Sequence, residues 1–467
     1  MRQVAEQRRH FTLLLAVMFM TAGGFAHAQS LQQFQSALET AIARAEPSVV
    51  AIARVRQGSA VAPADPAFVP SEYATGVVVG KGQILTSYHV LGNPEHYDYW
   101  VWHGGAPYQV VKVERPRAAD PWLDLALLEI EAETQPITLG DANTLKKGHI
   151  VVALGNPYAI ARDGEVSASL GIVSNLKRKA PPLPGQETRE TLHQLGTLLQ
   201  VDARLPRGCS GGALINTRGE LVGLTLSLAA LADEDTEAGF AIPVDETFRR
   251  ALKKLQLGQV DNYGYLGVLP ASLPLRERQE GKRGVLVQNV MPGTPAAAAG
   301  LRRMDLIVEV AGQPVANPHQ LVRIIGALPA GRETELVVER GEQRRSTLRR
   351  TVLLSKKRVA GDLPVIAEEE PQPWRGATVE YLTAMPEYPF HSYKIDPLGS
   401  VGLVAVEEGS PMHRAGFRSG DYVSHVNGKR VSTPAEFLAL ADKQAGVVEL
   451  RRPASQGAQA EDVQVSP

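Results

Sequence analysis

"RGCSGGALIN", residues 207–216, places two candidate nucleophiles, Cys209 and Ser210, side by side in a glycine-rich turn. Glycines around these residues suit a backbone that bends sharply and lets another chain approach closely. A glycine turn with no chemistry has the same appearance. The ten residues alone therefore leave three interpretations open: a cysteine nucleophile, a serine nucleophile, or neither.

The bulk composition is that of a globular protein with several domains. A chain of 467 residues is too long for one compact core, so we expect two to four domains. Hydrophobic residues make up 44% of the chain and charged residues 21%, which is ordinary for globular proteins. The 49 basic and 50 acidic residues nearly cancel, so the net charge gives no argument for a nucleic-acid partner.

The first 28 residues have the pattern of a signal peptide. Arginines precede an apolar run over 11–25, and Ala26-His27-Ala28 has the A-x-A form of a cleavage site. The run is shorter than the roughly 20 residues that a membrane-spanning helix needs. An uncleaved membrane anchor is the alternative. With a single cysteine no intramolecular disulfide can form, so an exported chain must be held together by its cores alone.

Residues 45–241 consist of short apolar runs separated by glycine, asparagine and proline. The runs include "SVVAIARV", "GVVVGKGQILTS", "DLALLEI", "GHIVVALGNP" and "GALINTRGELVGLTLS". Runs of strand length at this spacing, with "KGQ" and "TRGE" as turns, predict an all-β barrel or sandwich. Helical periodicity appears in "LQQFQSALETAIARA" before this region and in "VDETFRRALKKLQ" at its end.

After that helix the sequence repeats itself. "GTPAAAAGLRRMDLIVEVAGQPVANPHQL" begins at Gly293, and "GSPMHRAGFRSGDYVSHVNGKRVSTPAEF" begins at Gly409. Two copies this far apart indicate a duplicated domain of about 90 residues and not a solenoid. Met304 stands where the second copy has Gly420, so a left-handed turn there would place a small strain on the first copy.

A histidine and a carboxylate complete the chemistry that a serine nucleophile needs. Most of the 11 histidines suit surface positions, but in "GQILTSYHV" a strand ends in a turn at His89. Asp124 opens the apolar run "DLALLEI", a place where an acid is commonly only a solvated strand end. The order His89, Asp124, Ser210 is nevertheless one of the known triad orders.

Taken together, the stretches that contain His89, Asp124 and Ser210 resemble the chymotrypsin-like protease domain of the HtrA/DegP family of periplasmic quality-control serine proteases. The repeats resemble the tandem PDZ domains of the same family. The resemblance implies a mainly β chain, with a chymotrypsin-like double β-barrel protease domain followed by two small α+β PDZ domains. The matching stretches are "ILTSYHV", "DLALLEI", "PITLGDANTLKKGHIVVALGNPY", "LGIVSN", "LLQVDARLPRGCSGGALINTRGELVGLTLS" and "GFAIPV".

The resemblance assigns roles to the residues of the turn and its partners. Ser210 would be the nucleophile, His89 the general base and then acid, and Asp124 the residue that orients the imidazole. Backbone N–H groups of Gly208 and Ser210 would form the oxyanion hole. Cys209 stands where the family commonly carries asparagine, and we interpret it as a packing residue.

Substrate contacts are implied in the same way. Thr225, Leu226 and Ser227 would present backbone groups to an extended substrate, which pairs as an added strand. No metal or organic cofactor is implied.

A second binding element is expected in the repeats. "YGYLGV", 263–268, resembles the carboxylate-binding loop of PDZ domains, which would comprise Tyr265, Leu266, Gly267 and Val268. A plain strand start after a linker is the alternative. In the second repeat "WRGATVEYL" keeps one glycine and an apolar pair, which leaves peptide binding there open.

The resemblance thus implies an exported, periplasmic, ATP-independent serine endopeptidase that cleaves unfolded or damaged proteins. Its PDZ domains would bind substrate C-termini or regulate activity, and the chain would form trimers or multiples of trimers. Two alternatives stay open: a catalytically silent chaperone or peptide-binding scaffold, and a membrane-anchored protease that cleaves one signalling protein. The expected divisions are a signal peptide (1–28), a protease domain (29–257), a first PDZ domain (263–355), a linker (356–373), a second PDZ domain (374–453) and a flexible tail (454–467).

Overall fold

The computed structural model describes most of the chain from residue 31 onward. The predicted signal peptide, 1–28, lies outside the described residues. Residues 31–45 form the predicted helix, which packs Ala41 and Ala45 into the core. No helix within the described part of the chain is long and apolar enough to cross a membrane. The described residues are 31–58, 68, 70, 72–104, 109–156, 166–179, 191–227, 238–341, 346–359, 366–367, 373–386, 388, 396, 398–443, 445–453 and 459–467.

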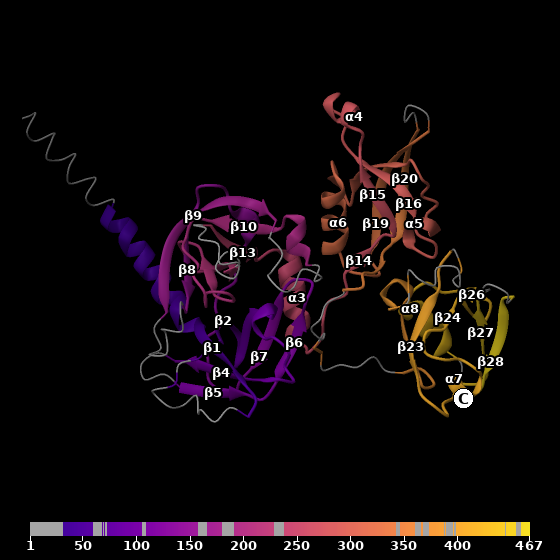
Figure 1. The fold of residues 1–467 in the computed structure, drawn as a ribbon, viewed down its shortest axis with the longest axis horizontal. Coiled ribbons are helices and arrows are strands. Elements are labelled where there is room, and N and C mark those ends of the chain that lie inside the picture. The colour runs from indigo at the N-terminus through magenta and orange to yellow at the C-terminus, as the bar shows by residue number, and fades with distance from the viewer. Residues whose placement is uncertain are drawn as a thin grey trace, which may run out of the picture.

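Two antiparallel β-sheets form the N-terminal part of the molecule (Figure 1). The first sheet has the order β5-β4-β1-β2-β3-β7-β6, and the second is a closed barrel with the order β10-β13-β12-β11-β8-β9. Two predicted turns have left-handed glycines, Gly82 with φ of 65° and Gly219 with φ of 76°. The strands of the first sheet are β1 (Val49–Arg56), β2 (Glu72–Gly80), β3 (Gln83–Ser87), β4 (Tyr97–His103), β5 (Gln109–Val113), β6 (Pro116–Asp120) and β7 (Leu125–Glu129). Those of the barrel are β8 (Ile150–Gly155), β9 (Ser167–Arg178), β10 (Leu198–Val201), β11 (Ala213–Ile215), β12 (Leu221–Leu226) and β13 (Gly239–Pro243).

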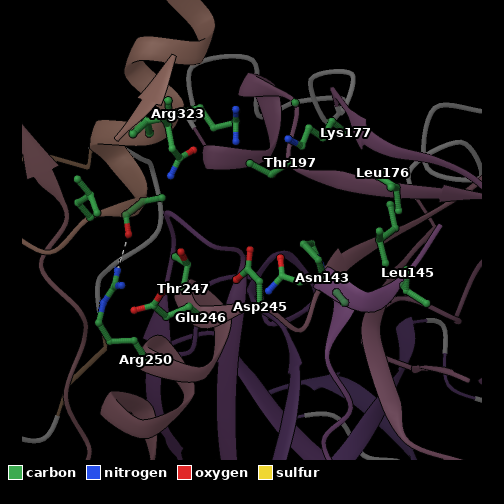
Figure 2. Close-up of a pocket in the computed structure, with 18 of the residues that line it drawn as sticks. Asn143, Leu145, Leu176, Lys177, Thr197, Asp245, Glu246, Thr247, Arg250 and Arg323 are labelled. Atoms are coloured by element: carbon green, nitrogen blue, oxygen red, sulfur yellow. Dashed lines mark hydrogen bonds between the residues drawn. The ribbon is translucent and has the colours of Figure 1, made fainter. Parts of the chain in front are cut away.

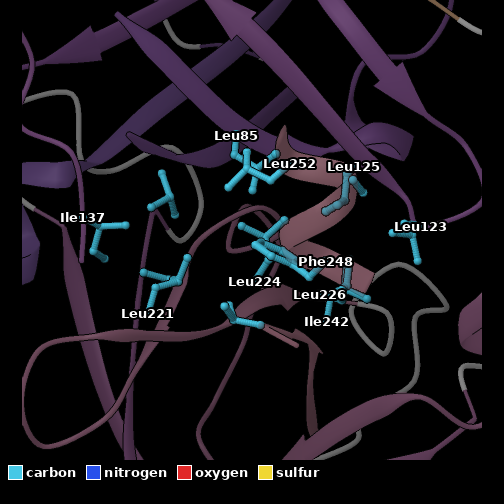
Figure 3. Packing of buried hydrophobic residues seen from close by; sticks show 14 of the residues in the cluster. Leu85, Leu123, Leu125, Ile137, Leu221, Leu224, Leu226, Ile242, Phe248 and Leu252 are labelled. Atoms are coloured by element: carbon cyan, nitrogen blue, oxygen red, sulfur yellow. The ribbon is translucent and has the colours of Figure 1, made fainter. Parts of the chain in front are cut away.

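A shared hydrophobic core joins the two sheets to helix α3 (Glu246–Gln256), as Figure 3 shows. Leu85 and Leu125 enter it from the first sheet, and Leu224 and Ile242 enter it from the barrel. The apolar residues of α3 recur every three or four positions, so one face of the helix is buried in this core. Because the sheets share one core, the loops along the seam between them keep fixed relative positions. The buried α3 side chains are Phe248, Ala251, Leu252 and Leu255.

Two small units follow, each built from short strands with helices packed against them (Figure 1). Four of these helices, α5 to α8, begin with a side-chain cap, for example Asn317 at α6 and Thr433 at α8. The first small unit contains β14 (Gly264–Tyr265), β15 (Val268–Ser272), α4 (Leu275–Gln279), β16 (Val285–Val290), α5 (Pro295–Ala298), β17 (Leu306–Val310), β18 (Gln313–Pro314), α6 (Pro318–Ala327), β19 (Glu333–Arg340), β20 (Ser346–Leu353) and β21 (Ser355–Lys356). The second contains β22 (Ala377–Tyr381), β23 (Val401–Val406), α7 (Pro411–Arg414), β24 (Tyr422–Val423), β25 (His425–Val426), β26 (Lys429–Arg430), α8 (Pro434–Ala441), β27 (Val448–Arg452) and β28 (Glu461–Val465). Short 3-10 turns lie between these elements: η1 (Glu46–Ser48), η2 (Tyr88–Val90), η3 (Ala142–Thr144), η5 (Leu192–Leu195) and η7 (Leu382–Ala384).

The sequence repeat is a repeat of backbone geometry as well. Asp305 and Asp421 hold matching positions, and their carbonyls accept the N–H groups of Val287 and Leu403 at 2.8 Å each. Met304 has φ of 72° where Gly420 has 89°. The turn is therefore left-handed in both copies, which is the condition under which the sequence predicts a small strain at Met304.

The prediction of a flexible tail over 454–467 is wrong for its second half. Residues Glu461–Val465 form β28, which pairs with β27 along its length. Val463 and Val465 point to the core of the second small unit, and Val465 is fully buried. Two valines at strand spacing are enough to hold an edge strand on a preformed sheet, although the overall apolar content of the tail is low.

Candidate active site

The nucleophile candidate lies in a turn that only glycine can build. Ser210 is buried just before β11, between Gly208 with φ of 101° and Gly211 with φ of 83°. A Cβ at Gly208 would lie 2.4 Å from the carbonyl oxygen of Asn156, and one at Gly211 would lie 2.2 Å from that of Thr75. Both glycines are therefore required by conformation and by contact.

His89 brings its imidazole from the first sheet to this turn. It lies in the 3-10 turn that follows β3, and its Nε2 is 3.3 Å from Ser210 Oγ. Its Nδ1 is 2.6 Å from Asp124 Oδ2, and both side chains of this pair are only 5% exposed. Distances of this order are typical of a nucleophile, base and orienting carboxylate before substrate binds.

Asp124 is held in an uncommon conformation. Its φ is 55°, in the left-handed region that is uncommon for residues other than glycine, although aspartate tolerates it better than most. Asp124 Oδ1 accepts the backbone N–H of His89 at 2.9 Å, and the carbonyl of Asp124 accepts that of Tyr88 at 3.0 Å. The backbone of the turn that carries His89 thus fixes the Asp124 carboxylate, and the carboxylate contacts the imidazole of the same residue.

The oxyanion loop, residues 208–210, offers two unused donors. Among the described residues, the N–H groups of Gly208 and Ser210 donate to no acceptor, whereas that of Cys209 donates to the carbonyl of Pro206 at 3.1 Å. Unpaired N–H groups beside a nucleophile are the geometry that stabilises a developing oxyanion.

Cys209 does not share this chemistry. Its side chain is 5% exposed, and its Sγ packs so closely on Gly155 that a Cβ there would lie 3.0 Å away. Burial raises the pKa of the Cys209 thiol to about 12. The reactive thiolate is therefore scarce at neutral pH.

The substrate-strand expectation is wrong for Thr225. Its N–H donates to the carbonyl of Gly212 at 2.9 Å, and its carbonyl accepts the N–H of Gly211 at 2.8 Å, so neither backbone group is available. Leu226 ends β12 opposite Phe240. Ser227 lies closest to the chemistry, because its N–H donates to Ser210 Oγ at 3.0 Å.

The predicted carboxylate loop of the first small unit turns at a left-handed glycine. Gly267 has φ of 87°, and a Cβ there would lie 2.1 Å from the Cβ of Thr294. The carbonyls of Leu266 and Gly267 accept the N–H groups of Ala296 and Met291 at 2.9 Å each, which turns them away from the loop opening. Tyr265 ends β14 before this turn, and Val268 begins β15 after it.

The second small unit has a loop with corresponding carbonyl contacts in "WRGATVEYL", the stretch for which the sequence left peptide binding open. Arg375 and Gly376 have φ of 48° and 82°. Their carbonyls accept N–H groups from Met412 and Glu407, at the repeat positions of Ala296 and Met291. The available signal was the glycine in "WRGATVEYL", which takes the place of Gly267.

A cavity of about 480 Å³ lies between the barrel and the first small unit, away from the triad (Figure 2). Arg323 of α6 faces Asp245 and Asn143 across it. Burial lowers the pKa of Arg323 and raises that of Asp245. None of His89, Asp124 and Ser210 lines this cavity, so it is distinct from the catalytic candidate.

A buried polar contact joins the first small unit to the loop that precedes Asp124. Tyr263 donates its hydroxyl to Asp120, whose Oδ1 also accepts the N–H groups of Trp122 and Leu123 at 3.0 and 3.1 Å. The Trp122 indole donates to the carbonyl of Gly326 at 2.9 Å. Desolvation raises the pKa of Asp120 to about 7, although these hydrogen bonds oppose the shift.

Family comparisons agree with this architecture. Residues 74–224 match the model of the trypsin-like peptidase domain, and residues 286–340 and 402–451 match that of the PDZ domain. The chain is therefore a serine endopeptidase of the trypsin-like class with PDZ domains, and its mainly β fold is as predicted.

Relatives identify the family within this class. The putative serine protease HhoA of Synechocystis is 30% identical over 300 residues, which cover 60% of this chain and 70% of HhoA. The periplasmic serine endoprotease DegP of Salmonella typhimurium is 28% identical over 384 residues, 80% of this chain and 73% of DegP. The periplasmic pH-dependent serine endoprotease DegQ of Escherichia coli is 27% identical over 387 residues, 81% of this chain and 77% of DegQ. The chain belongs to the HtrA/DegP family of serine endoproteases.

Solved structures share the fold. The HtrA-type protease AlgW with decapeptide has a TM-score of 0.52 and 23% sequence identity, over 69% of this chain and 99% of AlgW. At this identity the similarity supports the fold alone.

Proposed function

We propose that this chain is an exported, ATP-independent serine endopeptidase that cleaves unfolded or damaged proteins with Ser210, His89 and Asp124. The observation that carries the proposal is the unbroken contact chain from Asp124 Oδ2 through the imidazole to Ser210 Oγ. The two free N–H groups of the oxyanion loop support it. We propose the expected domain divisions with it, except that the described part of the tail belongs to the second small unit.

The proposed reaction follows from these contacts. Ser210 Oγ attacks the scissile carbonyl carbon while its proton passes to His89 Nε2. The carbonyl electron pair moves to oxygen, where the N–H groups of Gly208 and Ser210 stabilise the negative charge. When the C–N bond breaks, the leaving amine takes the proton from His89. Water then repeats the attack on the acyl-enzyme, and a new carboxylate leaves.

Labelling with a fluorophosphonate probe, combined with casein digestion, tests this function. We expect the probe to modify Ser210, because it reacts only with an activated serine. Casein should be cut into fragments by the same preparation, at a rate that neither ATP nor EDTA changes. A folded protein that is unlabelled and leaves casein intact would support the silent scaffold instead.

The carboxylate loop of the first PDZ domain is proposed to bind peptide C-termini. In the first small unit the turned-away carbonyls of Leu266 and Gly267 leave amides for a carboxylate. In the second unit the Ala377 N–H already donates to the carbonyl of Trp374 at 2.9 Å, and Arg375 has a left-handed φ that Leu266 lacks. We therefore propose carboxylate binding for the first unit.

A fluorescent peptide with an apolar C-terminal residue should bind more tightly than its amidated twin. Loss of a charge-assisted hydrogen bond costs about 1.5–3 kcal/mol, which is roughly 10- to 100-fold in affinity. Fluorescence anisotropy with the wild-type chain measures both peptides. Equal affinities for the free-acid and the amidated peptide would show that the loop does not bind the terminal carboxylate.

Export and self-association complete the proposal. The signal-peptide pattern of 1–28 and the periplasmic relatives support export to the periplasm. Leu31 and Phe34 expose apolar side chains on the helix at 31–45, with 68% and 36% of their surfaces accessible. We propose that this helix contributes to contacts in trimers or multiples of trimers.

A further inference from the structure

Two buried threonines, one from each sheet, hold the oxyanion loop. Thr75 of β2 donates its hydroxyl to the carbonyl of Gly208 at 2.7 Å and its N–H to the carbonyl of Ser210 at 3.0 Å. Thr225 of β12 donates its hydroxyl to the carbonyl of Cys209. All three consecutive carbonyls of the loop are therefore bound by these two residues.

These contacts set the direction of the N–H groups, because the C=O and N–H of a trans peptide point to opposite sides. The Thr225 hydroxyl holds the carbonyl of Cys209, so the N–H of Ser210, on the same peptide, points away from Thr225. The Thr75 hydroxyl holds the carbonyl of Gly208 and thereby directs the N–H of Cys209 to Pro206. The N–H of Gly208 lies on the preceding peptide, and the Thr75 hydroxyl fixes it only through the Gly208 carbonyl on the other side of the same residue.

Thr75 is itself fixed on several sides. It is fully buried, and its Oγ1 also accepts the N–H of Asn156 at 2.8 Å. The Thr75 carbonyl accepts the hydroxyl of Thr86 at 2.7 Å. The same carbonyl oxygen would lie only 2.2 Å from a Cβ on Gly211, so the backbones of β2 and the loop are in close contact. The loop therefore rests against a rigid part of the first sheet, and a shift of its peptides would break buried hydrogen bonds.

We propose that Thr75 and Thr225 are positioning residues that keep the oxyanion loop in its working shape through their hydroxyl groups. The inference rests on the proposed function, because it takes the N–H groups of Gly208 and Ser210 as the oxyanion donors of the loop that the two hydroxyls hold. Of these two donors, the Thr225 hydroxyl orients that of Ser210 directly. Neither threonine touches the reacting atoms. Their effect is transmitted through the carbonyls of the loop.

Thr75→Val replaces the hydroxyl by a methyl group of similar size. We expect kcat for a short chromogenic peptide to fall about 10- to 100-fold, less than the 10²- to 10³-fold cost of deleting an oxyanion donor outright. KM should change less than about threefold, because the donors act mainly in the transition state. Thr75→Ser keeps the hydroxyl and should restore kcat to within about threefold of the wild type.

The measurement is kcat per active site, counted by fluorophosphonate titration, together with Ki for a peptide aldehyde. The aldehyde adduct places an oxyanion in the hole, so its Ki should rise by about the same factor as kcat falls. Thr334→Val is the matched control, a buried threonine of β19 outside the protease sheets, and it should change neither value. Thermal unfolding confirms that each variant is folded.

The outcomes separate this inference from the proposed function. If the wild type is neither labelled nor active, the proposed function is overturned. If the wild type is active and Thr75→Val keeps its kcat per active site and aldehyde Ki, the positioning role is overturned and the function stands. Should Thr75→Val not fold, the same comparison on Thr225→Val decides, since its hydroxyl holds the Ser210 peptide directly.

Discussion

We expect Ser210→Ala to lower the turnover of casein and of chromogenic peptides about 10⁵- to 10⁶-fold. Ser210 Oγ is the oxygen that lies 3.3 Å from His89 Nε2. Alanine leaves no atom to accept the acyl group, so only the oxyanion hole and substrate binding remain to accelerate attack by water. Active-site labelling and steady-state kinetics on the purified variant measure the loss.

Cys209→Ser is the matched control for this prediction. The Cys209 side chain packs against Gly155 on the far side of the loop, and its raised thiol pKa keeps it protonated. Serine has nearly the same size, so turnover should fall at most a few-fold, and iodoacetamide should not inactivate the wild type. If Ser210→Ala keeps its activity after repeated purification, the nucleophile is not Ser210. If Cys209→Ser alone loses activity while fluorophosphonate still labels Ser210, Cys209 is needed for the shape of the loop and not for the attack.

The sequence predicted those features that depend on local pattern. Apolar runs such as "SVVAIARV" became strands, and the aligned repeat identified Met304 as the residue that a left-handed turn would strain. The order of His89, Asp124 and Ser210 pointed to residues that the fold brings together from two sheets. The sequence pattern and the family resemblance were enough to predict these features, because each of them lies at a turn or at the end of a strand, where local sequence determines the backbone.

The features that the sequence did not predict depend on tertiary contacts. Thr225 lies in the stretch expected to bind substrate, but its backbone is paired with Gly211 and Gly212 and its hydroxyl donates to the carbonyl of Cys209. Thr75 is separated from that loop by more than a hundred residues, so no spacing rule links them. The buried bond between Tyr263 and Asp120 likewise joins two domains. Such partners are chosen by packing and not by local sequence.

Asp124 receives two hydrogen bonds that an amide cannot reproduce together. Oδ1 accepts the backbone N–H of His89 at 2.9 Å, and Oδ2 accepts Nδ1 at 2.6 Å. Asparagine has one oxygen and one NH2 group. If its oxygen faces the backbone N–H, the NH2 group faces Nδ1 and forces the tautomer that carries its proton on Nε2. In that tautomer Nε2 cannot take the proton of Ser210.

Asp124→Asn is therefore expected to lower kcat for a chromogenic peptide at pH 7 about 10⁴-fold, the scale known for this change in other triads, while thermal unfolding stays near that of the wild type. Asp120→Asn is the matched control, a buried aspartate four residues earlier, at the end of β6. Because burial raises the pKa of Asp120 to about 7, much of it is already neutral at that pH, and an isosteric amide should cost less than about tenfold. The comparison is made on active-site-titrated preparations, so that loss of folded protein is not counted as loss of rate. A folded Asp124→Asn enzyme whose kcat lies within tenfold of the wild type would contradict the role of this carboxylate, since its two acceptors would then not set the tautomer of His89.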